Sequence, residues 1–119
     1  MSDDQKRIPA VFFRTEAGRE PVREWLLELS KKERVLVGHD IKDVEYGWPV
    51  GMPTCRPLGS GLYEVRTNLV SRNIARVIFS IQGERMVLLH GFIKKTKKTP
   101  KADLDLAKER KMQWEKNDG

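Results

Sequence analysis

The stretch Arg85-Met86-Val87-Leu88-Leu89-His90-Gly91-Phe92-Ile93 is the most apolar run of the sequence. A short continuous apolar run of this kind is typical of a strand with neighbours on both sides. Two further strand-like runs, residues 62–68 and 74–81, precede it, and Gln82-Gly83 supplies a tight turn. The three runs predict an antiparallel meander, with residues 85–93 in the interior of the sheet.

Two helices are predicted upstream of the meander. Pro21 suits the first position of a helix, and the apolar residues after it recur at the spacing of one helical face: Val22, Trp25, Leu26 and Leu29. Ser30 and Glu33 have capping-box spacing, which predicts a second helix from near residue 31 until Gly47 and Pro49 end it. Its buried face would comprise Val37, Ile41 and Val44. We expect the two helices to form an antiparallel hairpin.

The two ends of the chain complete the predicted order of elements. Residues 8–13 are predicted to form a first strand with Pro9 at its start, and the glycine- and proline-rich residues 46–61 to form a loop. Thr99 and Pro100 suit the cap and first turn of a last helix, whose apolar side would comprise Ala102, Leu106 and Trp114. This order predicts an α+β fold in a single domain over residues 1–119.

Composition restricts the possible functions. The 119 residues carry a net charge of +6, which favours an anionic partner: nucleic acid, an anionic membrane or an acidic protein. The single cysteine, Cys55, cannot form an intrachain disulfide, and we expect a buried or half-buried thiol. The polar residues 1–7 differ from a signal peptide, and no apolar stretch has the length of a membrane span. These features predict a soluble cytoplasmic protein with no membrane partner.

A basic segment follows the apolar strand directly. Residues 85–101 contain five lysines, one arginine and no acidic residue; the lysines are Lys94, Lys95, Lys97, Lys98 and Lys101. Side chains placed directly after an interior strand would be held on a firm base, and clustered ammonium groups favour phosphate. A solvated surface or a contact for an acidic protein would have the same charge, so charge alone does not decide between these interpretations.

Two arginines on the neighbouring strands extend this basic cluster. In a meander, Arg66 and Arg76 would lie close to the C-terminal end of the last strand. Arginine can bind a phosphate at two points. When RNA is cleaved by its own 2′-hydroxyl, the phosphorane accumulates negative charge, which a ring of arginines and lysines would stabilise.

The same reaction needs a base for the 2′ proton and an acid for the leaving 5′ oxygen. His90 on the last strand and His39 in the second helix are the histidine candidates. A histidine among apolar strand residues is more often a packed, hydrogen-bonded core residue. A lysine surrounded by other cations is the other candidate base.

Other chemistries are disfavoured because their motifs are missing. The sequence has no HExxH, no paired CxxC and no carboxylate cluster at ligand spacing, so no metal or other cofactor is predicted. It has no P-loop, dinucleotide fingerprint or GxSxG. We interpret Glu64 as solvated charge. Few side chains of residues 20–47 could read bases from an exposed face, which disfavours a helix-turn-helix DNA reader.

Three motifs in the second half of the chain together resemble a known family. They are Pro57-Leu58-Gly59-Ser60-Gly61-Leu62-Tyr63-Glu64-Val65-Arg66, Ala75-Arg76-Val77-Ile78-Phe79, and Val87-Leu88-Leu89-His90-Gly91-Phe92-Ile93-Lys94-Lys95-Thr96-Lys97-Lys98-Thr99-Pro100. In this order they resemble the pattern of phage-derived Gp49-like, HigB-type toxins of the RelE/ParE superfamily. The first strand and the helices resemble it loosely.

The resemblance implies a RelE-like fold and the toxin of a type II toxin–antitoxin system. Such toxins usually cleave messenger RNA in the ribosomal A site, and a helix-turn-helix antitoxin, here HigA-like, neutralises them. By position, Arg66 resembles the family's transition-state arginine, Arg76 resembles the arginine of the middle strand, and Lys94 and Lys95 resemble the basic pair after the last strand. The last helix lacks the tyrosine of better-described RelE members, which leaves the base open between His90 and the lysines.

Together with the basic cluster, the resemblance implies a ribosome-dependent, metal-independent endoribonuclease. The catalytic candidates are Arg66, Arg76, His90, Lys94 and Lys95, and the candidate RNA contacts are Arg56, Lys97 and Lys98. Two alternatives stay open: a ParE-like gyrase inhibitor that acts by protein contact, and a non-catalytic RNA-binding module.

Overall fold

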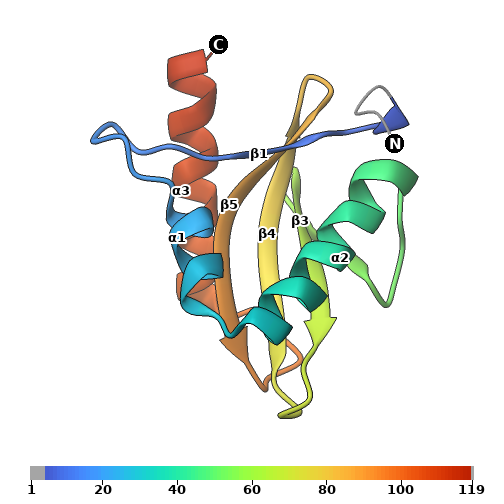
Figure 1. The fold of residues 1–119 in the computed structure, drawn as a ribbon. Helices are drawn as coiled ribbons and strands as arrows, with labels where there is room; N and C mark the ends of the chain where they lie inside the picture. Colours follow the sequence, from blue (N-terminus) through green and yellow to red (C-terminus); the bar gives the residue numbers. More distant parts are fainter. Residues whose placement is uncertain (1–4, 119) are drawn as a thin grey trace.

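The computed structural model describes residues 5–118 (Figure 1). Its elements are β1 (Ala10–Phe12), α1 (Pro21–Glu28), α2 (Lys31–Gly47), β2 (Cys55–Gly59), β3 (Leu62–Asn68), β4 (Ile74–Gln82), β5 (Arg85–Lys94) and α3 (Lys101–Asp118). This order confirms the predicted α+β class and is compatible with a RelE-like fold. Residues 1–4, which belong to the predicted polar N-terminal segment, and residue 119 lie outside the described residues.

The five strands form one sheet in the order β1-β5-β4-β3-β2. Strands β2 to β5 are an antiparallel meander, whereas β1 pairs in parallel with β5, with Ala10 opposite Met86. The predicted interior position of β5 is confirmed. The predicted loop over residues 46–61 is wrong at β2, an edge strand in which Pro57 can be accommodated because one side of the strand has no partner.

Helices α1 and α2 cover one face of the sheet (Figure 1). The capping box is confirmed: the Ser30 hydroxyl accepts from the backbone of Glu33, and the Glu33 carboxylate accepts from the backbone of Ser30. The predicted apolar positions of both helices enter the core, together with strand residues such as Val77, Phe79 and Leu88. The predicted pair of helices with a short connection is present, since only Leu29 and Ser30 separate α1 from α2. The hairpin is open: α1 packs on β5 and α2 packs on β3, and the helices diverge across the sheet.

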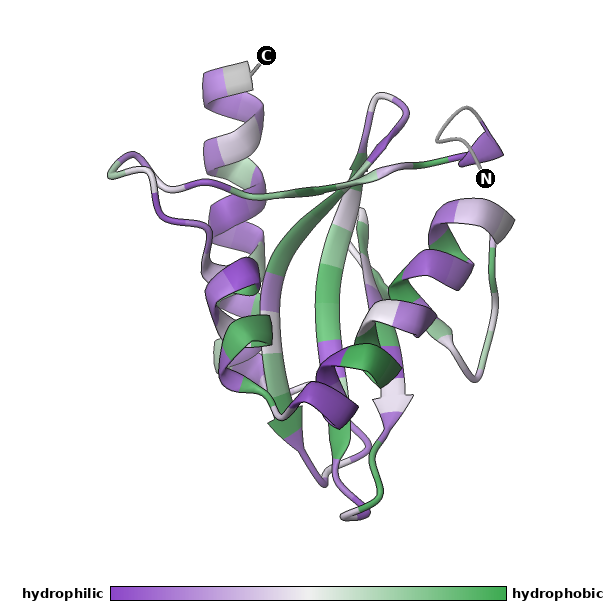
Figure 2. Ribbon diagram, viewed as in Figure 1, coloured by the Kyte–Doolittle hydropathy of each residue, from purple (hydrophilic) through white to green (hydrophobic). Residues whose placement is uncertain are grey.

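Helix α3 covers part of the opposite face. A second apolar cluster there includes Leu62, Ile78, Val87, Leu89, Phe92 and Ala107, and Leu104 and Trp114 pack against it. The predicted apolar side of this helix is therefore only partly right, since Ala102 is exposed and Ala107 is fully buried. Figure 2 shows strands that are mostly hydrophobic and helices in which hydrophilic and hydrophobic residues alternate.

A β-bulge in β5 changes which side chains face α3. Phe79 pairs with Leu88, but the preceding Ile78 pairs with His90, so Leu89 is an extra residue in the ladder. Leu89 lies in the cluster under α3, and after the bulge the alternation restarts, which turns His90 to the same side. The guanidinium of Arg110 on α3 donates to the carbonyl of Leu89 at 2.8 Å. The bulge and its helix contact thus direct His90 towards α3.

Candidate functional site

The strand register brings the predicted residues together on the α3 side of the sheet, next to the apolar cluster. Arg66 pairs with Arg76, and Arg76 pairs with Phe92, which forms one row across three strands. Glu64 and His90 lie in the adjacent row, separated by one residue of β4. Because side chains alternate along a strand, both rows face the same side. The prediction that both arginines lie close to the end of β5 is confirmed.

Glu64 is fully buried, so its interpretation as solvated charge is wrong. Its Oε2 accepts a hydrogen bond of 2.7 Å from the hydroxyl of Thr99, in the loop before α3. Its Oε1 lies 3.8 Å from Nε of Arg66. Glu64 therefore contacts both the basic loop, through Thr99, and Arg66 on its own strand.

Arg76 is fully buried as well, and its guanidinium lies 5.9 Å from the centre of the Phe92 ring. Among the described residues, its three side-chain nitrogens have no hydrogen-bond partner, and neither does Oε1 of Glu64. Burial lowers the pKa of Arg76, and the negative charge of Glu64 opposes this shift. In this conformation Arg76 contributes a positive charge from beneath the surface instead of a direct contact.

His90 forms a short contact with α3. Its Nε2 lies 2.7 Å from Oδ1 of Asp103, and its ring stacks on Phe92 with the ring centres 5.2 Å apart. Burial lowers the pKa of His90, and the hydrogen bond and charge of Asp103 oppose this shift. The second oxygen of Asp103 lies 3.5 Å from Nζ of Lys94. One carboxylate thus contacts two of the predicted catalytic residues.

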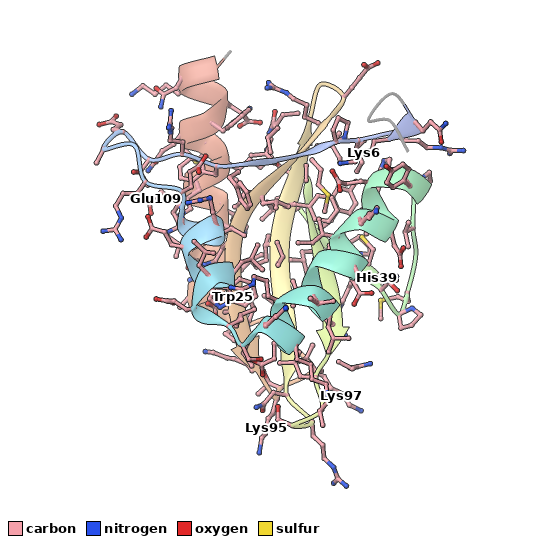
Figure 3. All side chains as sticks on the ribbon, viewed as in Figure 1. Lys6, Trp25, His39, Lys95, Lys97 and Glu109 are labelled. Carbon is pink, nitrogen blue, oxygen red and sulfur yellow. The ribbon has the colours of Figure 1, made fainter. Side chains whose placement is uncertain are left out.

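The predicted RNA contacts surround the loop between β5 and α3. Lys94, Lys95, Lys97 and Lys98 are all exposed. Arg56 on β2 is half-buried and donates from Nη1 to the carbonyl of Lys97 at 3.1 Å, which connects the edge strand to the loop. Lys95 and Lys97 lie at the lower end of the sheet in Figure 3. The loop therefore presents its lysines to solvent. Hydrogen bonds attach it to the sheet: one from Arg56 to the loop backbone, and one from the hydroxyl of Thr99 to Glu64.

Arg66 is also one of the residues beside a pocket on the α2 side of the sheet. Its side chain is 14% exposed, and the residue helps to line a pocket of about 280 Å³ between α2 and β3, with His39, Asp40 and Thr67 among the other lining residues. The hydroxyl of Thr67 donates to the carboxylate of Asp40 at 2.7 Å on the wall of this pocket. His39, the other candidate base, is thus placed on the α2 side of the sheet, apart from His90 (Figure 3).

Two further features concern Cys55 and metal binding. Cys55 is buried as expected, and burial together with the charge of Glu64 raises the pKa of its thiol to about 11. Within the described residues, His39, Asp40 and Asp43 on α2 form the one group whose ligand atoms, all within 4.8 Å of one another, could hold a metal ion. Exposed acidic groups of this kind are common without an ion.

Sequence reasoning missed three residues of this site. The alternation of β3 places Glu64 on the same side as Arg66, and this was a usable signal. Thr99 was assigned to a helix cap, and its hydroxyl instead donates to Glu64. Asp103 was not singled out from the sequence, because its contact with His90 depends on how the helix docks and on the bulge.

Comparison with known proteins assigns the chain to a family. Residues 24–112 match the model of the family described as "Phage derived protein Gp49-like", whereas no curated protein matches the chain. The matched region extends from α1 to α3 and contains Arg66, Arg76, His90 and Lys94. Within the part of the chain that the structure describes, no helix is both long and apolar enough to cross a membrane. The chain therefore belongs to the phage-derived Gp49-like family, a RelE/HigB-type family of toxins from toxin–antitoxin systems.

Proposed function

We propose that this toxin is a ribosome-dependent endoribonuclease that cleaves messenger RNA through the RNA's own 2′-hydroxyl. One observation carries the proposal: Arg66, Arg76, His90 and Lys94 share one side of the sheet, beside a loop of exposed lysines. Cations at this density suit a pentavalent phosphorane, and a histidine among them suits proton transfer. In this proposal the arginines and lysines supply the positive charge that a metal ion would otherwise bring to the phosphorane.

The proposed roles follow from the exposure of each side chain. Arg66, Lys94 and Lys95 would contact the scissile phosphate and stabilise the charge of the phosphorane. Arg76 would add its charge from beneath, because it is fully buried. His90 would accept the proton of the 2′-hydroxyl, and the exposed ammonium group of Lys95 would give a proton to the leaving 5′ oxygen. The products would carry a 2′,3′-cyclic phosphate and a 5′-hydroxyl.

The proposed partners follow from the family and from the surface charge. Lys97, Lys98 and Arg56 would hold the RNA backbone on the ribosome, where exposed ammonium groups contribute affinity that depends on salt. The toxin–antitoxin family implies an antitoxin, and we propose a helix-turn-helix protein of the HigA-like kind. Activity on translated messages would place the toxin in the cytoplasm, acting as a single domain over residues 1–119.

The test is induction of the toxin in cells, followed by mapping of RNA 5′ ends on translated messages. We expect growth arrest with new cleavages inside codons, both of them lost in Lys95→Ala and retained in Lys31→Ala, which removes an exposed lysine at the start of α2. Growth arrest with intact messages and a DNA-damage response would contradict the nuclease proposal and favour gyrase inhibition. RNA binding without arrest or cleavage would favour the non-catalytic module.

A further inference from the structure

We infer that Asp103 is a positioning residue that sets the proton arrangement of His90 and holds Lys94 beside it. The inference rests on the proposed function, since it assigns Asp103 a role in the same site. It starts from a geometric fact: the two oxygens of one carboxylate contact different candidate groups, His90 through Oδ1 and Lys94 through Oδ2.

Asp103 is held firmly for this role. It lies in the first turn of α3, where the backbone N–H of Leu104 donates to the carbonyl of Pro100. One turn later Ala107 is fully buried against the sheet, so the position of the helix is fixed. The helix dipole stabilises a negative charge at a helix N-terminus. The side chains of Asp103 and His90 are each 15% exposed, which limits competition from water.

The contact determines which nitrogen of the His90 ring carries the proton. An ionised carboxylate can only accept hydrogen bonds, so at 2.7 Å the Nε2 of His90 must be the donor. In the neutral imidazole this leaves Nδ1 without a proton and able to accept one. Asp103 would thereby keep His90 in the form that can take the proton of the 2′-hydroxyl, with Nδ1 as the basic atom.

The charges around His90 explain why this carboxylate matters. Burial together with the positive charges of Arg110 on α3 and Lys94 on β5 lowers the pKa of His90, and Asp103 is the group that opposes them. The facing residue on β4, Ile78, is apolar, and the Phe92 ring stacks on the imidazole. Without Asp103 the imidazole would be a weaker base with a free choice of tautomer.

The experiment compares Asp103→Asn with Asp105→Asn. Asp105 is a matched control because it lies two residues further on the same helix and pairs with the exposed Lys101. A His39→Gln background leaves His90 as the one remaining histidine of the sequence, so its ring signals are unambiguous in NMR spectra. We expect a protected Nε2–H signal in the parent and in Asp105→Asn, and loss of that protection with a lower His90 pKa in Asp103→Asn.

The activity of the same variants tests the role of the contact. As pH rises, cleavage should increase while His90 loses its proton, and this acidic limb should move to lower pH in Asp103→Asn. The plateau rate should fall by about 10–100-fold, as for other groups that orient a functional histidine. Asp103→Glu should recover part of the loss.

An unchanged His90 pKa and Nε2–H signal in Asp103→Asn would overturn the pairing of Asp103 with His90. An altered signal with an unchanged rate profile would overturn the role of Asp103 in cleavage. Absence of cleavage by the parent protein would instead contradict the proposed function and with it this role.

Discussion

The two faces of the sheet use the same strands in different ways. Under α1 and α2, the side chains of β4 and β5 are apolar along their length, from Met86 and Phe79 to Ala75 and Ile93. On the α3 side, the apolar cluster gives way to a charged group that includes Arg76. The difference follows from the covering layer, because α3 begins at residue 101 and a basic loop covers the remaining part of this face.

The charged half of the α3 side, which contains Glu64 and Arg76, lowers the stability of the fold. Among the described residues, the buried guanidinium of Arg76 has no hydrogen-bond partner, and neither does Oε1 of the buried Glu64. Both groups carry a desolvation cost that nearby charges offset only in part. Apolar side chains at the positions of Arg76 and Glu64 would remove that cost, and the side chains that β4 and β5 place under α1 and α2 are apolar. The comparison therefore shows an apolar face under α1 and α2 and a face under α3 that keeps buried charge at a cost in stability, as the proposed cleavage site would require.

The largest expected effect is on catalysis, from Arg66→Ala. Removal of one transition-state cation should reduce the cleavage rate by about 10²–10³-fold. The matched control is Arg23→Ala, which removes an exposed arginine of α1 on the other side of the sheet and should cleave at the parent rate. Cleavage assays on the two purified variants, at equal folded concentration, make the comparison. Equal rates for both would remove the functional distinction between the faces.

The second effect is on stability, on the face of the sheet under α1 and α2. A Cβ at Gly91 would lie 2.3 Å from the nearest ring carbon of Trp25, so Gly91→Ala forces the α1 contact to shift. Overpacking of this kind should lower the free energy of unfolding by about 1–3 kcal/mol. Gly38→Ala adds a methyl group where nothing lies within 4 Å and should raise stability slightly. Urea denaturation distinguishes them, and a Gly91→Ala protein as stable as Gly38→Ala would contradict the packing described for α1.

A smaller effect is the pH dependence that buried charge gives to the α3 side. His90 has a folded-state pKa below its ordinary 6.5, so the unfolded chain binds protons more readily. The stability from neutral His90 is present above about pH 6.5 and is lost as the pH falls through the folded-state pKa, by about 1.4 kcal/mol per unit of difference. Denaturation from pH 7.5 to about 5 should show a shallower decline in His90→Gln. A parental slope in His90→Gln would exclude His90 as its source.

The smallest effect concerns the exposed lysines of the basic loop. Lys97→Ala and Lys98→Ala should each reduce the salt dependence of RNA binding by about 0.7 in the slope of log affinity against log salt, if each contacts one phosphate of single-stranded RNA. Lys31→Ala, on α2, should leave the slope unchanged. Binding titrations at several salt concentrations measure this slope. An equal reduction of the slope in all three variants would mean that the net positive charge attracts RNA without a defined binding site.

Sequence patterns of a few residues correctly predicted helix starts and strands. The capping box at Ser30 and the alternation of β3 gave correct elements because caps and strand periodicity are local. Strand β2 was missed because its pairing with β3 overrides the weak strand preference of Pro57 and Gly59. For the site, Arg66 and the lysines were identified from charge and resemblance. The burial of Glu64 and the contact between His90 and Asp103 depend on the docking of α3, which no local pattern encodes.

The chemistry of the RNA ends tests most directly whether the charged half of the α3 side is a cleavage site. Purified toxin would be added to ribosomes translating a defined message, and the termini of any fragments would be identified. We predict new fragments with 2′,3′-cyclic phosphate and 5′-hydroxyl ends for the parent protein and almost none for Arg66→Ala. An intact message, or fragments that end in 3′-hydroxyl and 5′-phosphate groups, would contradict cleavage by the 2′-hydroxyl at this site.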